Sequence, residues 1–342
     1  MAGKNNDPLL LGGGRRRLDQ VIELAIHSSA VVVIAAVVLI FIFVGKEALP
    51  VITSKLVHEE VTVGSMIAPQ DDGQYTWQPM STQPKYCLLP LLIGTMKVTL
   101  VSLVIAIPVA IAAAIFTSEF APPILREIIK PVVELLAGIP SVVIGFFALM
   151  VLATYVQDTF GLTFRLNAIS AGAGLSLAVI PIVYTVAEDA LSAVPQAFRD
   201  GSLALGANRW QTAWRVVLPA AMPGVFAACV LGFGRAIGET MIVLMASGNA
   251  ATISWDPTQS FRTFSATIAA ELGEVVQGSP HYHVLFFIGA LLFVITFLLN
   301  LAGHWYVSRL SRKLQGKSKP GLLRRLKPRG PASGGPVAKA VP

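Results

Sequence analysis

The chain has few charged residues, and they are unevenly placed. Asp, Glu, Lys and Arg make up 13% of its 342 residues, about half of the roughly 25% usual in soluble domains. They are absent from six long stretches, which cover 24–45, 98–118, 135–157, 166–187, 216–234 and 275–308. A bilayer core about 30 Å thick needs about 20 apolar residues in a helix. Because a chain of this length cannot hide six such stretches in one core, the sequence predicts an all-α, polytopic transmembrane helix bundle of about six spans.

Cysteines and chemical motifs are scarce as well. The two cysteines, Cys87 and Cys229, are too few for a disulfide framework. The pair His281 and His283 has no recognised metal-ligand spacing, and neither a nucleophile motif nor an array of paired carboxylates indicates an intramembrane hydrolase. We therefore predict no catalytic residues, no metal and no cofactor.

Basic residues dominate the charge that is present, and the net charge is +7. If the spans alternate from a cytoplasmic N-terminus, 19 of the 26 Lys and Arg residues fall in inner segments. This is the positive-inside asymmetry that orients membrane proteins. The basic C-terminal tail is then a topology anchor beside anionic lipid rather than an arm for nucleic acid. The sequence predicts a multi-pass protein of the inner (plasma) membrane with both termini in the cytoplasm.

The sequence predicts three regions. Residues 1–20 are expected to form a flexible cytoplasmic N-terminus, residues 21–310 the transmembrane domain, and residues 311–342 a basic, disordered cytoplasmic tail. The expected spans cover about 24–44, 89–116, 132–156, 168–187, 222–247 and 284–307. Within the transmembrane domain, 46–86 is expected as an external loop and 188–221 as an internal one. A short helix is expected within Ser265–Val276 at the outer face.

The internal loop 188–221 is predicted to contain two short helices. One face of the first helix would carry Phe198, Ser202 and Leu205. Gly206 is a natural C-terminal stop, and Asn208 can cap a second helix that carries two tryptophans and ends before Pro219. Such a helix pair would suit the grip of a partner protein. The alternative is an amphipathic segment that lies on the membrane surface.

The same loop carries a recognisable pattern. Asp200-Gly201-Ser202, three residues, Gly206, nine residues and then Val216-x-Leu218-Pro219 resemble the Glu-Ala-Ala loop of ATP-binding-cassette (ABC) importer permeases. In that family the loop forms a coupling helix docked in a cleft of the ATPase subunit. The departure is Asp-Gly-Ser for Glu-Ala-Ala, and glycine costs about 1 kcal/mol against alanine in a helix interior. The resemblance implies an ATPase contact through Asp200, Gly201, Ser202, Leu205, Gly206, Val216, Leu218 and Pro219.

Two further segments narrow the resemblance. Glu134-Leu-Leu-Ala-Gly-Ile-Pro-Ser141 and Gly234-Arg-Ala-Ile-Gly-Glu-Thr-Met241 look like signature segments of the phosphate-specific permease subunits PstC and PstA. Met241, Val243-Leu-Met and Gly248-Asn249 favour the PstC type. With the loop, the resemblance covers about 90–307 and implies the type I ABC importer permease fold. It also implies a PstA-like second permease, two cytoplasmic PstB-like ATPase subunits and an external, PstS-like phosphate-binding protein.

Arg235 and Glu239 stand out without any resemblance, because they lie four residues apart in the predicted fifth span. An arginine at the bilayer centre costs about 2.5–3.5 kcal/mol even on the lenient insertion scale, so it must face the bundle interior and have a partner. Glu239 is the nearest candidate, on the same helix face. The pair is either a structural ion pair or part of an anion pathway, in which guanidinium presents a fork of donors to phosphate oxygens. The two roles can coexist.

Other functions stay open at this point. An ion-coupled secondary transporter of an oxyanion would need a titratable relay, for which the spans offer only Arg235, Glu239 and Lys97. A non-transporting scaffold would leave the loop 188–221 and Arg235 unexplained. An ABC permease for a related oxyanion also remains possible as a function, because an arginine guanidinium binds the oxygens of the anion and does not distinguish its central atom.

Overall fold

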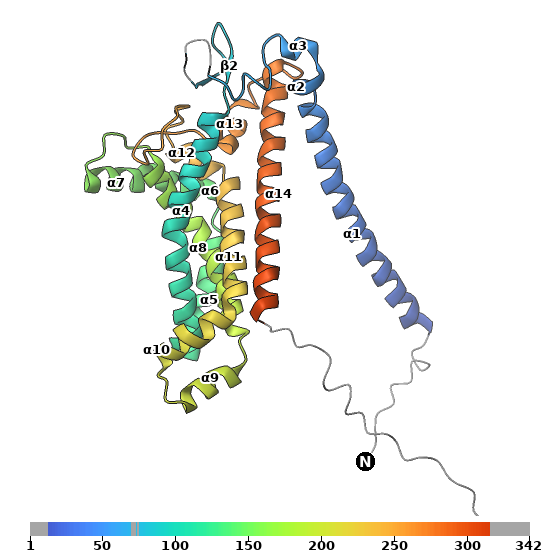
Figure 1. The fold of residues 1–342 in the computed structure, drawn as a ribbon. Coiled ribbons are helices and arrows are strands. Elements are labelled where there is room, and N and C mark those ends of the chain that lie inside the picture. Colours follow the sequence, from blue (N-terminus) through green and yellow to red (C-terminus); the bar gives the residue numbers. More distant parts are fainter. Residues whose placement is uncertain (1–12, 70–72, 74, 315–342) are drawn as a thin grey trace, which may run out of the picture.

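The computed structural model describes residues 13–69, 73 and 75–314, so most of the predicted N-terminal lead and tail lie outside the described residues. Within them, six helices are long and apolar enough to cross a membrane: Gln20–Thr53, Leu89–Phe120, Ser141–Phe160, Ala168–Ser192, Arg209–Gly238 and Pro280–Arg309. The predicted all-α bundle with about six spans is confirmed, and Figure 1 shows most of these helices running lengthwise between two ends of the bundle.

The centre of the bundle is formed by α4 (Leu89–Ile115), α8 (Ala168–Ser192) and α11 (Leu218–Gly238). Their buried faces are rich in small side chains, which let helix backbones approach closely in membranes. A Cβ atom added at Gly172 of α8 would lie 2.5 Å from a methyl carbon of Val101 of α4, and one at Gly232 of α11 would lie 2.5 Å from Val183 of α8. The three helices are therefore packed too tightly for larger residues at these points.

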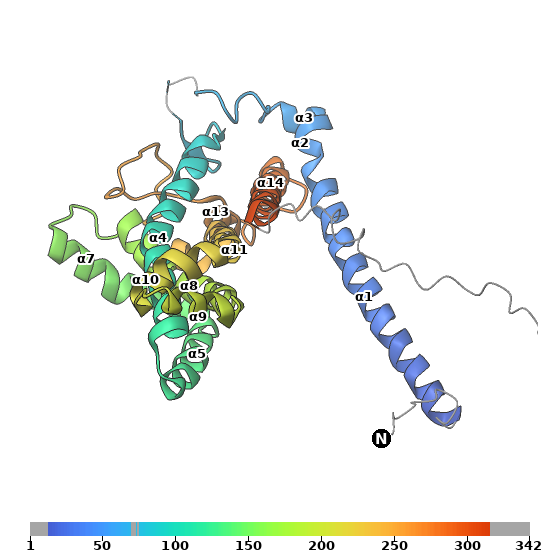
Figure 2. The ribbon, with the colours of Figure 1, turned by 60° about the horizontal axis from the view of Figure 1, so that its bottom comes forward.

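The first helix, α1 (Gly13–Ala48), diverges from the bundle (Figures 1 and 2). Near its C-terminal end it meets α14 (Pro280–Leu314), where the ring centroids of Phe41 and Phe293 are 4.2 Å apart. Along the rest of its described length the apolar side chains are exposed. This face of α1 is therefore left to lipid or to another subunit.

The third span begins later than expected. Instead of one helix over 132–156, the structure has α5 (Pro123–Ala137), α6 (Ser141–Phe147), a π-helical turn η3 (Ala148–Leu152) and α7 (Ala153–Phe160). Pro140 has φ −57° and ψ 134°, outside the helical region, and precedes α6. A proline lacks the N–H group that a helix interior needs and disfavours helical backbone at the residue before it. The chain therefore breaks at 138–140, and α5 is a separate amphipathic helix.

The fifth span is shifted in the other direction. Instead of 222–247, it runs from α10 (Arg209–Thr212) through the π-helical turn η4 (Ala213–Val217) into α11, and it ends at Gly238. Glu239 is extended (φ −70°, ψ 132°), and a new short helix, α12 (Met241–Ala246), follows. The expectation that the second loop helix ends before Pro219 was wrong. The wider π turn, in which the Leu218 N–H donates to the Ala213 carbonyl, places Pro219 where its missing N–H is tolerated.

The described residues of the expected external loop, 46–86, form several short elements. It contains α2 (Pro50–Thr53), α3 (Lys55–His58) and an antiparallel hairpin of β1 (Trp77–Gln78) and β2 (Lys85–Tyr86), with Trp77 opposite Tyr86. We call this end of the bundle the hairpin end. The opposite end, which carries α9 (Gln196–Ala204) and α10, is called the α9 end (Figure 1).

A charged cluster closes the hairpin end. The predicted short helix in this region is confirmed as α13 (Phe264–Glu271). The Glu271 carboxylate forms an ion pair with Arg262 at 2.7 Å and accepts hydrogen bonds from His281 at 2.9 Å and from the Trp77 indole at 3.1 Å. The cluster thus ties the hairpin to α13 and α14.

Candidate functional site

The loop at the α9 end has the predicted local architecture. Helix α9 ends at Ala204, with Leu205 as its C-cap residue, and Gly206 adopts the left-handed conformation (φ +86°) that glycine accommodates without strain. The Ala207 N–H then donates to the Ser202 carbonyl at 3.2 Å, which satisfies one of the free carbonyls of the last turn. Asn208 caps α10: its side chain accepts from the Gln211 N–H at 2.8 Å, and the Gln211 side chain accepts from the Asn208 N–H at 3.0 Å.

The structure divides the predicted ATPase-contact residues into three groups. Asp200, Gly201, Leu205 and Gly206 are exposed on α9 and its end, and the side chain of Leu205 is 91% exposed. Ser202 faces inward and shares a 3.0 Å hydrogen bond with Thr212 of α10. The other three predicted residues lie on the continuing helix, at Val216, Leu218 and Pro219. A Cβ atom at Gly201 would have no heavy atom within 4 Å, so the departure from the family pattern leaves the packing unchanged.

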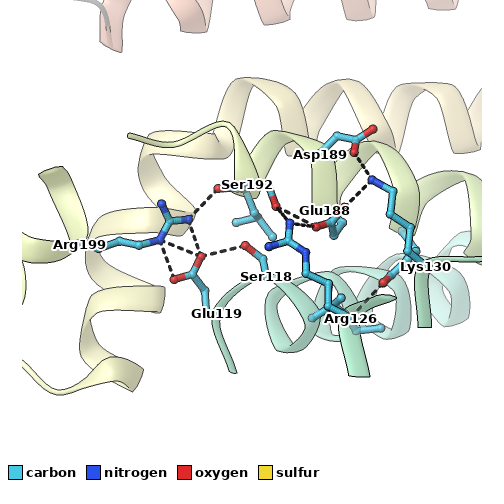
Figure 3. A network of polar contacts seen from close by, with 12 residues as sticks. Ser118, Glu119, Arg126, Lys130, Glu188, Asp189, Ser192 and Arg199 are labelled. Carbon is cyan, nitrogen blue, oxygen red and sulfur yellow. Dashed lines mark hydrogen bonds and ion pairs between the residues drawn. The ribbon is translucent and has the colours of Figure 1, made fainter. Parts of the chain in front are cut away.

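An ion pair anchors α9 to the membrane helices (Figure 3). Arg199 donates to both carboxylate oxygens of Glu119, at 2.7 and 3.0 Å, and Glu119 lies in the π-helical turn η2 (Phe116–Phe120) that ends α4. The same guanidinium donates to the Leu191 and Val194 carbonyls at the end of α8, at 3.0 and 2.6 Å. These contacts connect α9 directly to the ends of α4 and α8.

A second cluster beside it joins α5 to α8 (Figure 3). Glu188 of α8 is fully buried and accepts from Arg126 and, at 3.1 Å, from Lys130 of α5. Lys130 also pairs with Asp189 at 2.7 Å, and hydrogen bonds to Asp189 and Glu188 raise the pKa of Lys130 above its ordinary value. A buried carboxylate is costly unless it is paired, and here two cations pair it.

Sequence reasoning missed both clusters, because Arg126, Lys130 and Arg199 were interpreted only as orienting charges. Two local signals were available. Arg126 and Lys130 are spaced i, i+4 on one helix face, and Glu188-Asp189 follows directly after an apolar span.

Arg235 and Glu239 do come together, although not on one continuous helix. Arg235 lies in the last turn of α11, and Glu239 follows the break. One guanidinium nitrogen of Arg235 is 3.5 Å from a Glu239 carboxylate oxygen, beyond the usual range for a hydrogen bond. The Arg235 side chain is 46% exposed and that of Glu239 only 5%. In the part of the chain that the structure describes, the Arg235 guanidinium has no hydrogen-bond partner, so its donors are open to another acceptor.

Arg235 lines a groove of about 510 Å³ between α11 and α14. The groove is bordered by Leu231, Gly234, Arg235, Gly238, Gly289, Leu292, Phe293, Thr296 and Asn300. Thr296 and Asn300 were missed by sequence reasoning, since uncharged residues do not interrupt a charge-free stretch. The available signal was that Asn300 is the only Asn or Gln in the span Pro280–Arg309.

Each of the two signature segments contains a break between helices. Glu134–Ser141 joins α5 to α6, and Gly234–Met241 joins α11 to α12. The short helices that follow the breaks pack on each other: a Cβ atom at Gly145 of α6 would lie 3.1 Å from the Ile242 Cα atom of α12. Broken helices within a membrane often border a substrate pathway, and here two of them meet.

The family comparison agrees with this architecture. The family described as the inner membrane component of binding-protein-dependent transport systems matches residues 106–316, more than half of the chain. The chain belongs to this family. As a binding-protein-dependent permease with six apolar helices, it is a multi-pass inner-membrane protein and a transporter component rather than an enzyme.

Several relatives of this permease match over most of its length. It is 34% identical over 305 residues to the probable ABC transporter permease protein YqgH of Bacillus subtilis, which covers 89% of this chain and 96% of that protein. It is 35% identical over 251 residues to the phosphate transport system permease protein PstC 1 of Mycobacterium tuberculosis, covering 66% of this chain and 74% of the relative. The PstC protein of Xylella fastidiosa (strain 9a5c) is 32% identical over 256 residues, covering 69% and 78%.

The fold of the permease also has a solved counterpart. A chain in the crystal structure of a bacterial alginate ABC transporter, in complex with an alginate pentasaccharide-bound periplasmic protein, superposes with a TM-score of 0.55. The match covers 87% of this chain and 98% of that chain at 17% identity. The predicted ABC importer permease fold is confirmed.

Proposed function

We propose that this permease is the PstC-like membrane subunit of an ATP-driven phosphate importer. The observation that carries the proposal is Arg235, a guanidinium with free donors that lines a groove within the membrane span of a chain similar to PstC permeases. An arginine is costly in a membrane span and is therefore a candidate functional residue. Its donor fork matches the oxygens of phosphate.

Glu239 would hold Arg235 between passages of the anion. Its carboxylate is buried and lies 3.5 Å from the guanidinium, close enough to compensate the charge and too far for a full hydrogen bond. An arriving oxyanion can therefore take the free donors without first breaking a short ion pair. The helix breaks at 138–140 and 239–240 would let this part of the pathway change shape as the transporter opens and closes.

The proposed assembly contains a PstA-like sister permease, two PstB-like ATPase subunits and a PstS-like external binding protein. The exposed surface of α9, with Asp200, Gly201, Leu205 and Gly206, would dock in the ATPase cleft. The α9 end would then be cytoplasmic, with both termini, and the hairpin end would face the binding protein outside.

An ion-coupled secondary transporter is less well supported by the geometry. Lys97 is buried, donates to the Asp256 backbone carbonyl at 3.0 Å and lies 5.4 Å from the centroid of the Phe261 ring. These local contacts hold Lys97 near the hairpin end instead of placing it in a relay with Arg235.

The deciding experiment is radiolabelled phosphate uptake by the complete complex in reconstituted vesicles. We expect uptake to require ATP and the binding protein and to persist when the proton gradient is collapsed. Uptake driven by a proton gradient without ATP would contradict the proposal. If sulfate is taken up at the same rate as phosphate, the proposed substrate changes from phosphate to a broader class of oxyanions.

A further inference from the structure

We propose that Asn300 and Thr296 of α14 form a second wall of the anion site, opposite Arg235, so that the oxyanion is held between two helices. The inference rests on the proposed function and deepens it, because it adds two residues and a substrate chemistry to the groove. All three side chains border the same groove of about 510 Å³.

The position of Asn300 is set by Gly234. A Cβ atom added at Gly234 would lie 3.3 Å from the Asn300 Oδ1 atom and 3.7 Å from its Nδ2 atom. Gly234 is the neighbour of Arg235 in the chain, so the amide of α14 lies beside the turn of α11 that carries Arg235, and both residues line the same groove. Helices α11 and α14 run side by side here (Figures 1 and 2).

The polar groups of this wall have unused hydrogen-bonding capacity. Among the described residues, the exposed Asn300 amide has no hydrogen-bond partner. Thr296, one turn earlier on the same face, donates its hydroxyl to the Leu292 and Phe293 carbonyls at 3.0 and 2.9 Å. Its hydroxyl oxygen remains available as an acceptor. An unsatisfied amide is unfavourable in hydrocarbon, so Asn300 must meet water, a ligand or another subunit.

The combined donors and acceptors match an oxyanion that carries a proton. Guanidinium only donates, whereas an amide donates through its nitrogen and accepts through its oxygen. Hydrogen phosphate has P–O⁻ acceptors and a P–OH donor, while sulfate at neutral pH has acceptors only. In this groove, Arg235 and the Asn300 N–H groups would donate to the P–O⁻ oxygens, and the Asn300 carbonyl or the Thr296 oxygen would accept a hydrogen bond from the P–OH group. The substrate class is therefore a protonated tetrahedral oxyanion.

The competing role for Asn300 is a hydrogen bond to the sister permease, because polar side chains also join helices in membranes. The two roles give different results when Asn300 is replaced. A subunit contact is needed for assembly, whereas a substrate contact is needed for the rate of uptake by a complex that is already assembled.

The test is Asn300→Leu in the complete transporter, with ATP-driven phosphate uptake and subunit co-purification measured on the same preparation. Leucine inserts readily into a membrane helix. We expect normal assembly and a maximal uptake rate lowered about tenfold or more, as for the loss of a hydrogen bond to a charged group. Asn300→Asp should lower uptake at least as much, since it removes the donors and repels the anion. His304→Leu, one turn further along α14 and outside the groove lining, is the matched control and should change uptake less than about twofold.

The outcomes separate the two proposals. If Arg235→Ala abolishes uptake while Asn300→Leu transports at the normal rate, the second wall is wrong and the proposed function stands. If Arg235→Ala itself transports normally, the proposed anion site falls as a whole. Loss of the sister permease from the Asn300→Leu complex, with normal uptake per assembled complex, would assign Asn300 to the subunit interface.

Discussion

Arg235 and Glu239 occupy unequal surroundings, although they form one ion pair. The guanidinium is about half exposed in the groove, while the carboxylate is nearly buried. Removing the partner of a buried charge typically costs about 3–5 kcal/mol, because the remaining charge is left uncompensated. An Arg235 variant therefore tests both transport and stability, and the two effects need separate measurements.

We expect Arg235→Ala to abolish phosphate uptake while the assembled complex remains recoverable, because the pathway loses its fixed anion site. Arg235→Lys should also transport poorly, since an ammonium group cannot reproduce the planar donor fork. Uptake in vesicles and subunit stoichiometry after purification provide the two readouts.

The double variant Arg235→Ala, Glu239→Gln serves as the control for stability, because it removes both charges. If Arg235→Ala prevents assembly and the double variant restores both assembly and uptake, the pair is structural and the pathway role is wrong. A recovered but inactive double variant supports the pathway role.

Single residues differ in how well the sequence reveals them. Arg235 was predictable because a charge inside an apolar stretch is costly and needs an explanation. Asn300 was not, since an amide is tolerated in a span. The position of the Asn300 side chain also depends on its contact with Gly234 of another helix, which the sequence does not reveal. Glu188 was missed for a similar reason: its two cations lie about 60 residues earlier in the chain, on α5.

At the scale of elements, α9 exposes an apolar residue at its C-terminal end and is bound to the membrane helices through Arg199. Leu205 faces outward at its end, while Arg199 is bound to Glu119 and to the end of α8. Phe198 and Leu203 are exposed on the same short helix, and several exposed apolar side chains close together are typical of a docking surface. Helix α9 is thus held firmly on one side and free on the other.

We expect Leu205→Asp to leave membrane insertion and pairing with the sister permease normal but to prevent retention of the ATPase. Burying an unpaired carboxylate in an interface costs several kcal/mol, so phosphate uptake should be lost as well. Co-purification measures the effect. Leu56→Asp changes a similarly exposed leucine (76% exposed) at the hairpin end and is the matched control. Normal ATPase stoichiometry and intact uptake in Leu205→Asp would rule out the assignment of this loop.

The hairpin-end cluster gives a prediction of pH dependence. Burial raises the pKa of Glu271, but the hydrogen bond from His281, the Arg262 charge and the Trp77 bond outweigh it and leave the pKa below its ordinary value. A lowered carboxyl pKa contributes stability above the unfolded value, near 4.3, and this contribution is lost as pH falls through the folded pKa.

Glu271→Gln should therefore lower the stability of the purified protein by about 2 kcal/mol at pH 7, the scale of hydrogen bonds to a charged group. The difference from the wild type should shrink below about pH 4, as the wild-type carboxylate becomes protonated. Thermal unfolding of the detergent-solubilised protein at several pH values measures it. A difference that stays constant down to pH 3 would contradict the role given to the carboxylate charge.

For the whole molecule, the six spans were predictable, but the boundaries of the third and the fifth span were not. Charge-free stretches identify spans because each charge in hydrocarbon is costly. They do not locate breaks made of uncharged residues, and both 138–140 and the end of α11 at Gly238 fall within or beside such stretches. The divergence of α1 could not be predicted from the sequence either, since a helix covered by lipid and a helix covered by protein have the same apolar composition.

The proposed orientation, with both termini in the cytoplasm, rests on the distribution of basic residues and can be tested by labelling. In a variant without Cys87 and Cys229, a cysteine at Ser65 should react with a membrane-impermeant thiol reagent added to spheroplasts. A cysteine at Ser333, outside the described residues, should react only after permeabilisation. Ser65 is exposed at the hairpin end, so its reactivity is not limited by burial. Labelling at Ser333 in intact spheroplasts would contradict the six-span topology with cytoplasmic termini.

The π-helical turn between α10 and α11 has a mechanical consequence. The chain stays helical from Arg209 to Gly238, so α10 and α11 form the short and the long arm of one bent helix. The bend lies at Ala213–Val217 (Figure 1). A sideways push on the short arm becomes a torque on the long arm about its own axis. Arg235 lies in the last turn of the long arm, so a rotation of α11 about its axis would move the Arg235 guanidinium toward or away from α14. Force applied at the α9 end could thereby change the grip on an anion without any displacement of the helix along the membrane normal.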